Sequence, residues 1–180
     1  MSTNLLTHID VLVLLAVLAA AVTYDVSSRR IPNRLVLAGV AAALALHAGA
    51  SLAGEAAMAG QHPWSPLSGM LVGAATLLPM YALRACAAGD VKLMAVVGAF
   101  LGAPTALMAG FGTYLAGGLL SLAFLLRRGV AANTASNLRA MLRPGAVPAA
   151  VGVERTAARL PYAVAIAAGT VGALLLRLNP

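Results

Sequence analysis

The stretch Ala21–Leu35, AVTYDVSSRRIPNRL, decides how this chain folds. It closes one long apolar run, passes through Asp25 and a basic turn, and opens a second apolar run. Two apolar runs joined by a short charged turn are typical of two helices that cross a membrane in succession. Pro32 fixes the backbone of the turn, and Asn33 is placed to cap the second helix. The stretch therefore predicts a helical hairpin in a bilayer.

The composition extends this prediction to all 180 residues. The chain is 61% hydrophobic and 9% charged, and its mean hydropathy is +0.91. Soluble domains are about 45–50% apolar and about 25% charged. We therefore expect one all-α domain over residues 1–180, a polytopic membrane helix bundle. The net charge of +7 does not indicate nucleic-acid binding, because only 4% of the residues are aromatic and the charges lie in short connectors.

Six apolar segments are long enough, or nearly so, to cross a membrane, which takes about 20 helical residues. The fourth reaches that length only together with the ACAAGD stretch before it. The first is expected to be a retained helix and not a cleaved signal, since no basic residue precedes it and Asp10 interrupts it. The segments are approximately 5–24, 35–53, 66–83, 91–103, 105–126 and 161–176, with a turn at 102–104.

The basic residues predict how the segments are oriented. Every lysine and arginine except Arg177 falls in connectors on one side of the six-span topology. Because basic loops stay in the cytoplasm, we expect about six transmembrane helices with both termini outside. Asp25 and Asp90 then lie toward the cytoplasm, while Asp10 and Glu55 lie toward the outer side.

The longest connector, residues 127–159, permits two interpretations. Its NTASNLRAMLRPG stretch could form a short helix lying on the inner leaflet, with Arg139 and Arg143 near lipid phosphates. It could equally be an ordinary solvated connector. Glu154 beside Arg155 is read as a solvated ion pair.

Asp25 and Asp90 are the candidate catalytic residues. Each lies where an apolar span meets a cytoplasmic connector, and an ionisable residue at membrane depth points to function. Two aspartates at one depth could share a proton, one acting as base on a water and the other polarising a carbonyl. The structural alternative is that Asp25 pairs with Arg29 and that Asp90 caps a helix beginning at Val91.

The residues next to Asp90 favour a site that admits a peptide. Ala87, Ala88 and Gly89 are small, so they allow close backbone approach and leave room for substrate and water. Lys92 could favour an ionised carboxylate nearby. It could equally be a lysine whose ammonium reaches the membrane interface.

Three separated stretches carry a family resemblance. YDVSSRRIPNRL resembles the Asp-x-x-x-x-x-Ile-Pro-Asn element of prepilin peptidases. AAGDVKLMAVVGAFLG resembles their Gly-x-Gly-Asp-Val-Lys element, and LPYAVAIAAG their Pro-Tyr-x-x-Ala-Ile segment. The chain thus resembles the type IV prepilin leader peptidases, polytopic membrane aspartic proteases, and in length their short form associated with tight-adherence (Flp-type) pili.

The resemblance implies a function and a location. Asp25 and Asp90 would be the catalytic pair, with Ala87, Gly89, Lys92, Pro32 and Asn33 shaping the site and no cofactor. The substrate would be a prepilin, whose short basic leader is cut after a glycine at the cytoplasmic face of the bacterial inner membrane. Pilus assembly proteins and lipid would be partners, with the basic connectors meeting anionic lipid. Ala87 departs from the family pattern, which has glycine there.

Helix dipoles suggest where the shared proton would be. Asp25 follows a predicted helix C-terminus, where negative charge is disfavoured, and Asp90 precedes a predicted N-terminus, where it is favoured. Asp25 would then be the protonated acid and Asp90 the base. No metal is expected, because the histidines and the single cysteine, Cys86, have no ligand spacing.

Two other classes of function remain open at this point. A small proton-coupled transporter could use the same aspartates as a relay, but inverted repeats and midplane polar residues are not evident. A non-catalytic scaffold of pilus assembly would tolerate loss of both aspartates.

Overall fold

The computed structural model describes residues 5–83, 85–127 and 162–178. Within these ranges all regular structure is helical apart from one isolated bridge between Ala57 and Gly60, so the all-α class is confirmed there. The chain divides into a larger unit, residues 1–117 and 161–180, and a smaller unit, residues 118–160. The connector helix considered near residues 135–143 lies outside the described residues. The helices are α1 (Leu5–Ser28), α2 (Asn33–Leu52), α3 (Ser65–Ala82), α4 (Ala88–Arg127) and α6 (Tyr162–Leu178).

Three helical stretches in the described residues are long and apolar enough to cross a membrane. They are His8–Ser28, Asn33–Leu52 and Ala88–Ala123, and Tyr162–Arg177 is a shorter apolar helix. The chain is therefore a membrane protein. The count of about six spans and the outer location of both termini stay predictions.

The expected turn at residues 102–104 is confirmed as a break inside α4. Gly102 has φ 74° and ψ 168°, a conformation that favours glycine, and Pro104 follows it. A side chain at Gly102 would also collide with the backbone oxygen of Ala59. The sequence Gly-Ala-Pro therefore divides α4 into two helical arms.

The two arms run in opposite directions along α3. In the first arm Met94 lies against Gly73 and Gly98 against Gly69, an antiparallel pairing with α3. In the second arm Gly110 lies against Thr76, further along α3, so the chain has turned back. The second arm runs antiparallel to α6. Gly112 and Thr113 lie against Gly169, and Gly117 lies against Tyr162.

Glycines bring α3 and the first arm of α4 into backbone contact. A Cβ atom added at Gly69 would overlap the backbone oxygen of Gly98, and one added at Gly98 would overlap that of Gly69. Small residues allow this approach in a bilayer, where van der Waals packing drives helix association. This contact between Gly69 and Gly98, the glycine seam, sets the distance between α3 and the first arm of α4.

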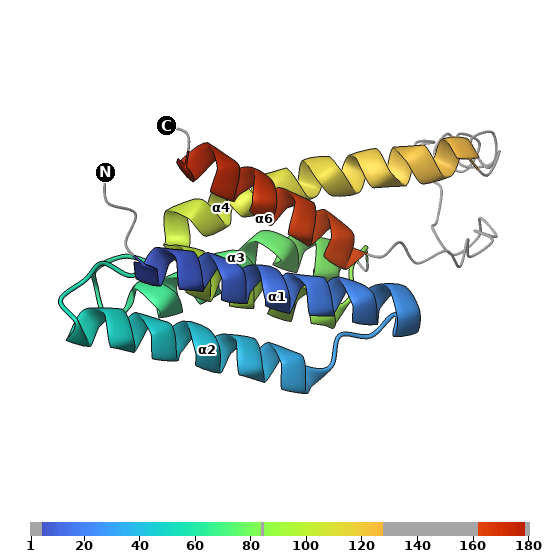
Figure 1. Ribbon diagram of the computed structural model, residues 1–180. Coiled ribbons are helices and arrows are strands. Elements are labelled where there is room, and N and C mark those ends of the chain that lie inside the picture. Colours follow the sequence, from blue (N-terminus) through green and yellow to red (C-terminus); the bar gives the residue numbers. More distant parts are fainter. Residues whose placement is uncertain (1–4, 84, 128–161, 179–180) are drawn as a thin grey trace. The chain divides into compact units, whose positions relative to one another are not determined.

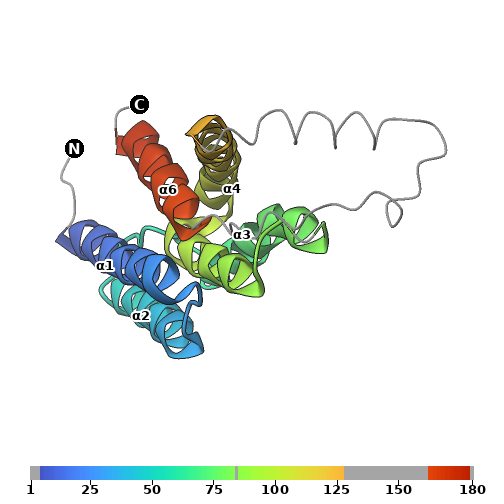
Figure 2. The same ribbon diagram turned by 90° about the vertical axis from the view of Figure 1, so that its right-hand side faces the viewer.

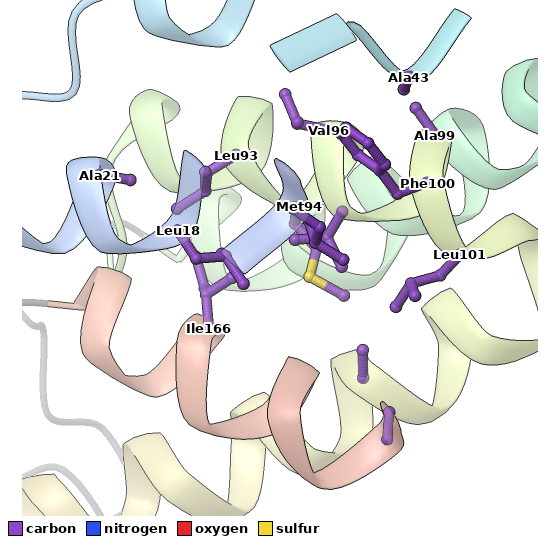
Figure 3. Packing of buried hydrophobic residues seen from close by; sticks show 14 of the residues in the cluster. Leu18, Ala21, Ala43, Leu93, Met94, Val96, Ala99, Phe100, Leu101 and Ile166 are labelled. Atoms are coloured by element: carbon purple, nitrogen blue, oxygen red, sulfur yellow. The ribbon is translucent and has the colours of Figure 1, made fainter. Parts of the chain in front are cut away.

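The first arm of α4 is the centre of the larger unit. Nearly every residue from Leu93 to Gly102 is buried, as expected for a helix that is apolar all round. In the larger unit α1 lies between α2 and α6 (Figures 1 and 2). Leu18 of α1, Leu93 of α4 and Ile166 of α6 point toward one another in the core (Figure 3).

A polar cluster closes the end of the larger unit where α1 begins. The Asp10 carboxylate accepts a hydrogen bond from the backbone N–H of Met58 at 3.2 Å. The Arg177 guanidinium donates to the backbone oxygen of Met58 at 2.9 Å and to that of Leu101 at 3.4 Å. Leu101 ends the first arm of α4, so Arg177 satisfies a carbonyl that the break leaves without its helical partner. We call Asp10, Met58 and Arg177 the Met58 clamp.

Candidate active site

Asp25 belongs to the buried stripe of α1. Asp10, Leu14, Leu18, Ala21 and Asp25 recur at three- and four-residue intervals, and all five are buried. This spacing places them on one side of a helix. Asp10 and Asp25 are 15 positions apart, so about 22 Å of helix separates them. The stripe thus carries a carboxylate into the protein at each end.

A backbone N–H of α6 holds the Asp25 carboxylate. Asp25 is only 8% exposed, and its Oδ2 accepts a hydrogen bond from the Ala163 N–H at 3.0 Å. Ala163 is the second residue of α6, where N–H groups have no partner within the helix. Asp25 therefore caps a helix whose first turn lies 138 positions further along the chain.

The end of α1 corrects the predicted placement of Asp25. Asp25 lies inside α1, which continues to Ser28, and not after the end of the helix. Arg29 leaves the helix with φ 54°, and its N–H bonds to the backbone oxygen of Asp25. Asp25 and Arg29 form no ion pair.

Asp90 lies in the first turn of α4. The helix begins at Ala88 and not at Val91, so Asp90 is its third residue and not its cap. Its Oδ2 accepts a hydrogen bond from the Ala87 N–H at 2.8 Å, and its own N–H donates to the Ala87 oxygen at 3.0 Å. The first of these bonds is one half of a capping box, in which an acidic side chain at the third helical position accepts the N–H of the residue before the helix. Asp90 is only 5% exposed.

Ala87 needs no glycine conformation. Among the described residues other than glycine, only Arg29 has a positive φ, so Ala87 lies where L-residues are found freely. Its hydrogen bonds to Asp90 use backbone atoms alone. Alanine in place of the family's glycine is therefore compatible with the local geometry.

The turn after α1 packs against the start of α4. A Cβ added at Gly89 would lie 3.4 Å from the Cβ of Ile31, an ordinary contact distance. Lys92 donates from Nζ to the Asn33 Oδ1 at 3.0 Å. Residues from the two sequence elements that flank the aspartates therefore meet, although 59 positions separate Asn33 from Lys92.

Asn33 does not cap α2, which corrects the prediction from the sequence. The residue before the helix is Pro32, with φ −64° and ψ 134°, and it makes no side-chain capping bond. The fixed φ of Pro32 does set the turn, as expected. Asn33 is instead the first helical residue, and its carboxamide accepts the bond from Lys92. Lys92 thus contacts Asn33, and it forms no ion pair with Asp90.

Asp25 and Asp90 lie close enough for their charges to interact. Within the described parts of the chain neither forms an ion pair with a basic side chain, and each accepts one backbone N–H. Two buried carboxylates without a counter-ion favour sharing a proton, because two negative charges at short range are costly there. The arrangement can therefore supply an acid and a base together.

The dipole argument for the proton no longer separates the two aspartates. Asp25 lies in the last turn of α1, where negative charge is disfavoured, but it also caps the N-terminus of α6, where it is favoured. Asp90 lies at the N-terminus of α4. Both carboxylates thus accept an N–H at the start of a helix, and the prediction that Asp25 is the acid loses its basis.

Cys86 and Tyr162 lie beside the aspartates and were not predicted as site residues. Burial, and to a lesser extent the charge of Asp90, raises the pKa of the Cys86 thiol to about 11. Tyr162 is the first residue of α6, next to Ala163, and its hydroxyl has no hydrogen-bond partner within the described structure. The only signal in the sequence was the Pro-Tyr pair, which says nothing of an unpaired hydroxyl.

The groups that could bind a metal are scattered over the described residues. No three histidine, cysteine, aspartate or glutamate side chains gather there in a way that could hold an ion. His47 instead contacts the backbone oxygen of His62 at 3.1 Å through its Nε2.

Comparison with known proteins gives one finding. The model of the type IV leader peptidase family matches residues 12–122, more than half of the chain and a range that includes Asp25 and Asp90. No curated protein matches the chain, and no solved structure does either.

Proposed function

Because the chain belongs to the type IV leader peptidase family, we propose that it cleaves the leader of type IV prepilins as a membrane aspartic endopeptidase. The observation that carries this is the burial of Asp25 and Asp90 near each other with no basic side chain paired to either in the described residues. The family makes the chain a protease. The aspartic mechanism, the Flp-type prepilin and the site of cleavage are the finer parts of the proposal.

The chemistry requires the two carboxyl groups in opposite protonation states. The ionised aspartate takes a proton from a water, and the water oxygen bonds to the scissile carbonyl carbon. The protonated aspartate gives its proton to the carbonyl oxygen, which yields a neutral tetrahedral diol. The diol then returns a proton through the carboxylates to the amide nitrogen, and the carbon–nitrogen bond breaks. The two aspartates end with one proton between them, as they began.

The surroundings of Asp90 suit a peptide substrate. Ala87 and Ala88 are exposed and small, so the side of α4 next to the carboxylate is not covered by long side chains. An extended peptide could approach there, with its glycine at the carboxyl groups. The apolar helix that follows the leader in a prepilin would lie among the lipid-facing side chains. The predicted position of this end, on the cytoplasmic side, agrees with a leader that is not translocated.

The test is leader cleavage with matched aspartate variants. The chain is co-expressed with a Flp-type prepilin precursor, and the gel shift of the pilin is compared for wild type, Asp25→Asn, Asp90→Asn and Asp10→Asn. We expect either of the first two variants to lower cleavage by about 10²- to 10⁴-fold, the usual contribution of a general acid or base. Asparagine can still accept the N–H bonds of Ala163 and Ala87, so both variants should insert and fold.

Asp10→Asn is the matched control. Asp10 lies on the same buried stripe of α1 and also accepts a backbone N–H, but at the other end of the helix. It should cleave at the wild-type rate. If a membrane-inserted Asp25→Asn or Asp90→Asn protein also cleaves at the wild-type rate, the aspartate mechanism is wrong and the scaffold alternative gains.

A further inference from the structure

The Tyr162 hydroxyl is a buried polar group that the aspartate mechanism does not use. Tyr162 is 9% exposed, and its Oη has no partner within the described structure. Buried hydroxyl groups are nearly always hydrogen-bonded, and an exception calls for an explanation. A tyrosine hydroxyl is a donor and an acceptor, so it can bind a group that arrives with the substrate.

The hydroxyl lies in the neighbourhood of the catalytic carboxylates. Tyr162 directly precedes Ala163, whose N–H holds Asp25. The Tyr162 hydroxyl also lies within electrostatic range of Cys86, Tyr114 and Asp90. Tyr162 therefore lies near both aspartates. The next residue, Ala163, bonds to Asp25, and the Tyr162 hydroxyl is within electrostatic range of Asp90.

Gly117 accommodates the ring of Tyr162. A Cβ built at Gly117 would lie 3.0 Å from the Tyr162 Cε2 and 3.1 Å from its Oη. The absence of a side chain at this position lets the aromatic ring lie against the second arm of α4. The ring is thus held by packing, while its polar tip is left without a bond among the described residues.

Tyr114 provides the internal comparison. Its hydroxyl donates to the backbone oxygen of Thr76 and so joins the second arm of α4 to α3. Tyr114 and Tyr162 are both near Cys86. One hydroxyl is therefore bonded within the described fold and the other is not, although they belong to the same neighbourhood.

We propose that the Tyr162 hydroxyl donates a hydrogen bond to a main-chain carbonyl of the bound prepilin, other than the scissile one. A peptide that enters this site extended brings carbonyl groups that have lost their water, and each needs a donor. The scissile carbonyl is served by the protonated aspartate, which leaves a neighbouring carbonyl for Tyr162. This assignment rests on the proposed peptidase function and adds a substrate-binding residue to it.

The experiment compares Tyr162→Phe with Tyr114→Phe in purified protein in detergent. Both thermal unfolding and steady-state cleavage of a synthetic precursor are measured; the precursor contains the basic leader, the glycine and the following apolar segment. Tyr162→Phe should be at least as stable as wild type, because the hydroxyl has no partner among the described residues and an unpaired buried hydroxyl costs free energy. Its KM should rise about 3- to 10-fold with kcat little changed, as for one lost neutral hydrogen bond made equally in ground and transition states.

Tyr114→Phe should show the opposite pattern. It loses a bond within the fold, so its unfolding temperature should fall while its KM stays at the wild-type value. An unchanged KM for Tyr162→Phe overturns the proposal. So does a lower unfolding temperature for that variant, because its hydroxyl would then be bonded within the resting protein.

A binding measurement separates this proposal from the peptidase function. In an Asp25→Asn, Asp90→Asn background, the Kd of the same precursor is measured by fluorescence anisotropy with and without the further substitution Tyr162→Phe. That substitution should weaken binding by the same factor as it raises KM. If wild type binds the precursor but does not cleave it, the peptidase function is wrong, and the Kd comparison still tests the Tyr162 contact. If wild type does not bind the precursor, both are wrong.

Discussion

The two ends of α1 each bury an aspartate, and their surroundings differ in charge. At Asp10 the partner is the Met58 N–H, and the oxygen of Met58 is bound by the cationic Arg177. His47 is also near enough to act on the charge of Asp10. At Asp25 the partner is the Ala163 N–H, and the nearby ionisable group is a second acid, Asp90. At the first end a basic side chain binds the same backbone segment as the aspartate, and at the second end two acids meet.

This difference distinguishes structure from chemistry. A buried carboxylate that accepts a hydrogen bond from a loop is suited to holding that loop, because the bond offsets part of its loss of water. A pair of carboxylates without a basic partner costs stability unless a proton is shared, and such sites are typical of catalysis. The Met58 clamp should therefore govern stability, and the aspartate pair should govern activity.

The largest effect is expected at the glycine seam, Gly69 and Gly98, because it positions the first arm of α4 between the two ends of the larger unit. Gly98→Ala would place a methyl group against the backbone of Gly69, and overpacking that backbone cannot relieve should cost more than about 3 kcal/mol. We expect no folded protein in detergent by gel filtration. Gly49→Ala is the control, since nothing lies within 4 Å of the added atom, and it should fold normally. A folded Gly98→Ala protein would show that the seam is looser than described.

Cys86 reports the charge at the aspartate pair. With a pKa of about 11, raised by burial and by Asp90, its thiolate is scarce at neutral pH. Alkylation by iodoacetamide at pH 8 should be about 100-fold slower than for an ordinary thiol, and should quicken as the pH rises toward 11. Asp90→Asn removes a nearby negative charge, which lowers the thiol's pKa and should speed alkylation.

The same protein unfolded in SDS is the reference for this reaction. Mass spectrometry of Cys86 over time gives both rates. Fast alkylation of the folded protein at pH 8, or no change in Asp90→Asn, would contradict the placement of the thiol beside that carboxylate.

The Met58 clamp gives a smaller effect, on stability alone. Arg177→Met leaves the carbonyls of Met58 and Leu101 without their donor, and this should cost about 1–2 kcal/mol. Arg177→Lys should recover part of the loss, since an ammonium can reach one carbonyl. Denaturant unfolding in detergent measures both variants. Loss of cleavage by folded Arg177→Met protein would break the division between the two ends.

The smallest effect is expected at the contact between Lys92 and Asn33. A double-mutant cycle of Lys92→Met and Asn33→Ala should give a coupling of at most about 1 kcal/mol, because both side chains are exposed. The two single variants should cleave the precursor at the same rate as each other. If Lys92→Met alone lowers cleavage, then Lys92 acts on Asp90 and not only through Asn33.

The sequence was sufficient for the helical class of the described residues and for the end of the bundle at which each aspartate lies. Apolar runs and the distribution of basic residues placed Asp25 and Asp90 together, and Gly102 with Pro104 marked the break in α4. These features are local, because propensity and hydrophobicity act within a few residues. The sequence also placed Arg177 apart from the other basic residues, at the end where Met58 is now found.

The contacts that define the site could not be foreseen. The N–H that holds Asp25 belongs to Ala163, and the amide that holds Lys92 belongs to Asn33, both far away in the chain. The dipole argument for the proton lost its basis for this reason: it considered only the helix that contains Asp25 and not the helix that Asp25 caps. A missing partner, as at Tyr162, is likewise visible only when the neighbours are placed.

The most direct test of the division between the two ends measures cleavage per folded molecule for Asp10→Ala and Asp90→Asn side by side, with the unfolding temperature of each. We predict that Asp10→Ala unfolds at a lower temperature, because the Met58 N–H is left unpaired, and cleaves the precursor at the wild-type rate. We predict that Asp90→Asn unfolds at the wild-type temperature and cleaves about 10²- to 10⁴-fold more slowly. Wild-type cleavage by Asp90→Asn, or lost cleavage by folded Asp10→Ala, would contradict the assignment of chemistry to one end and structure to the other.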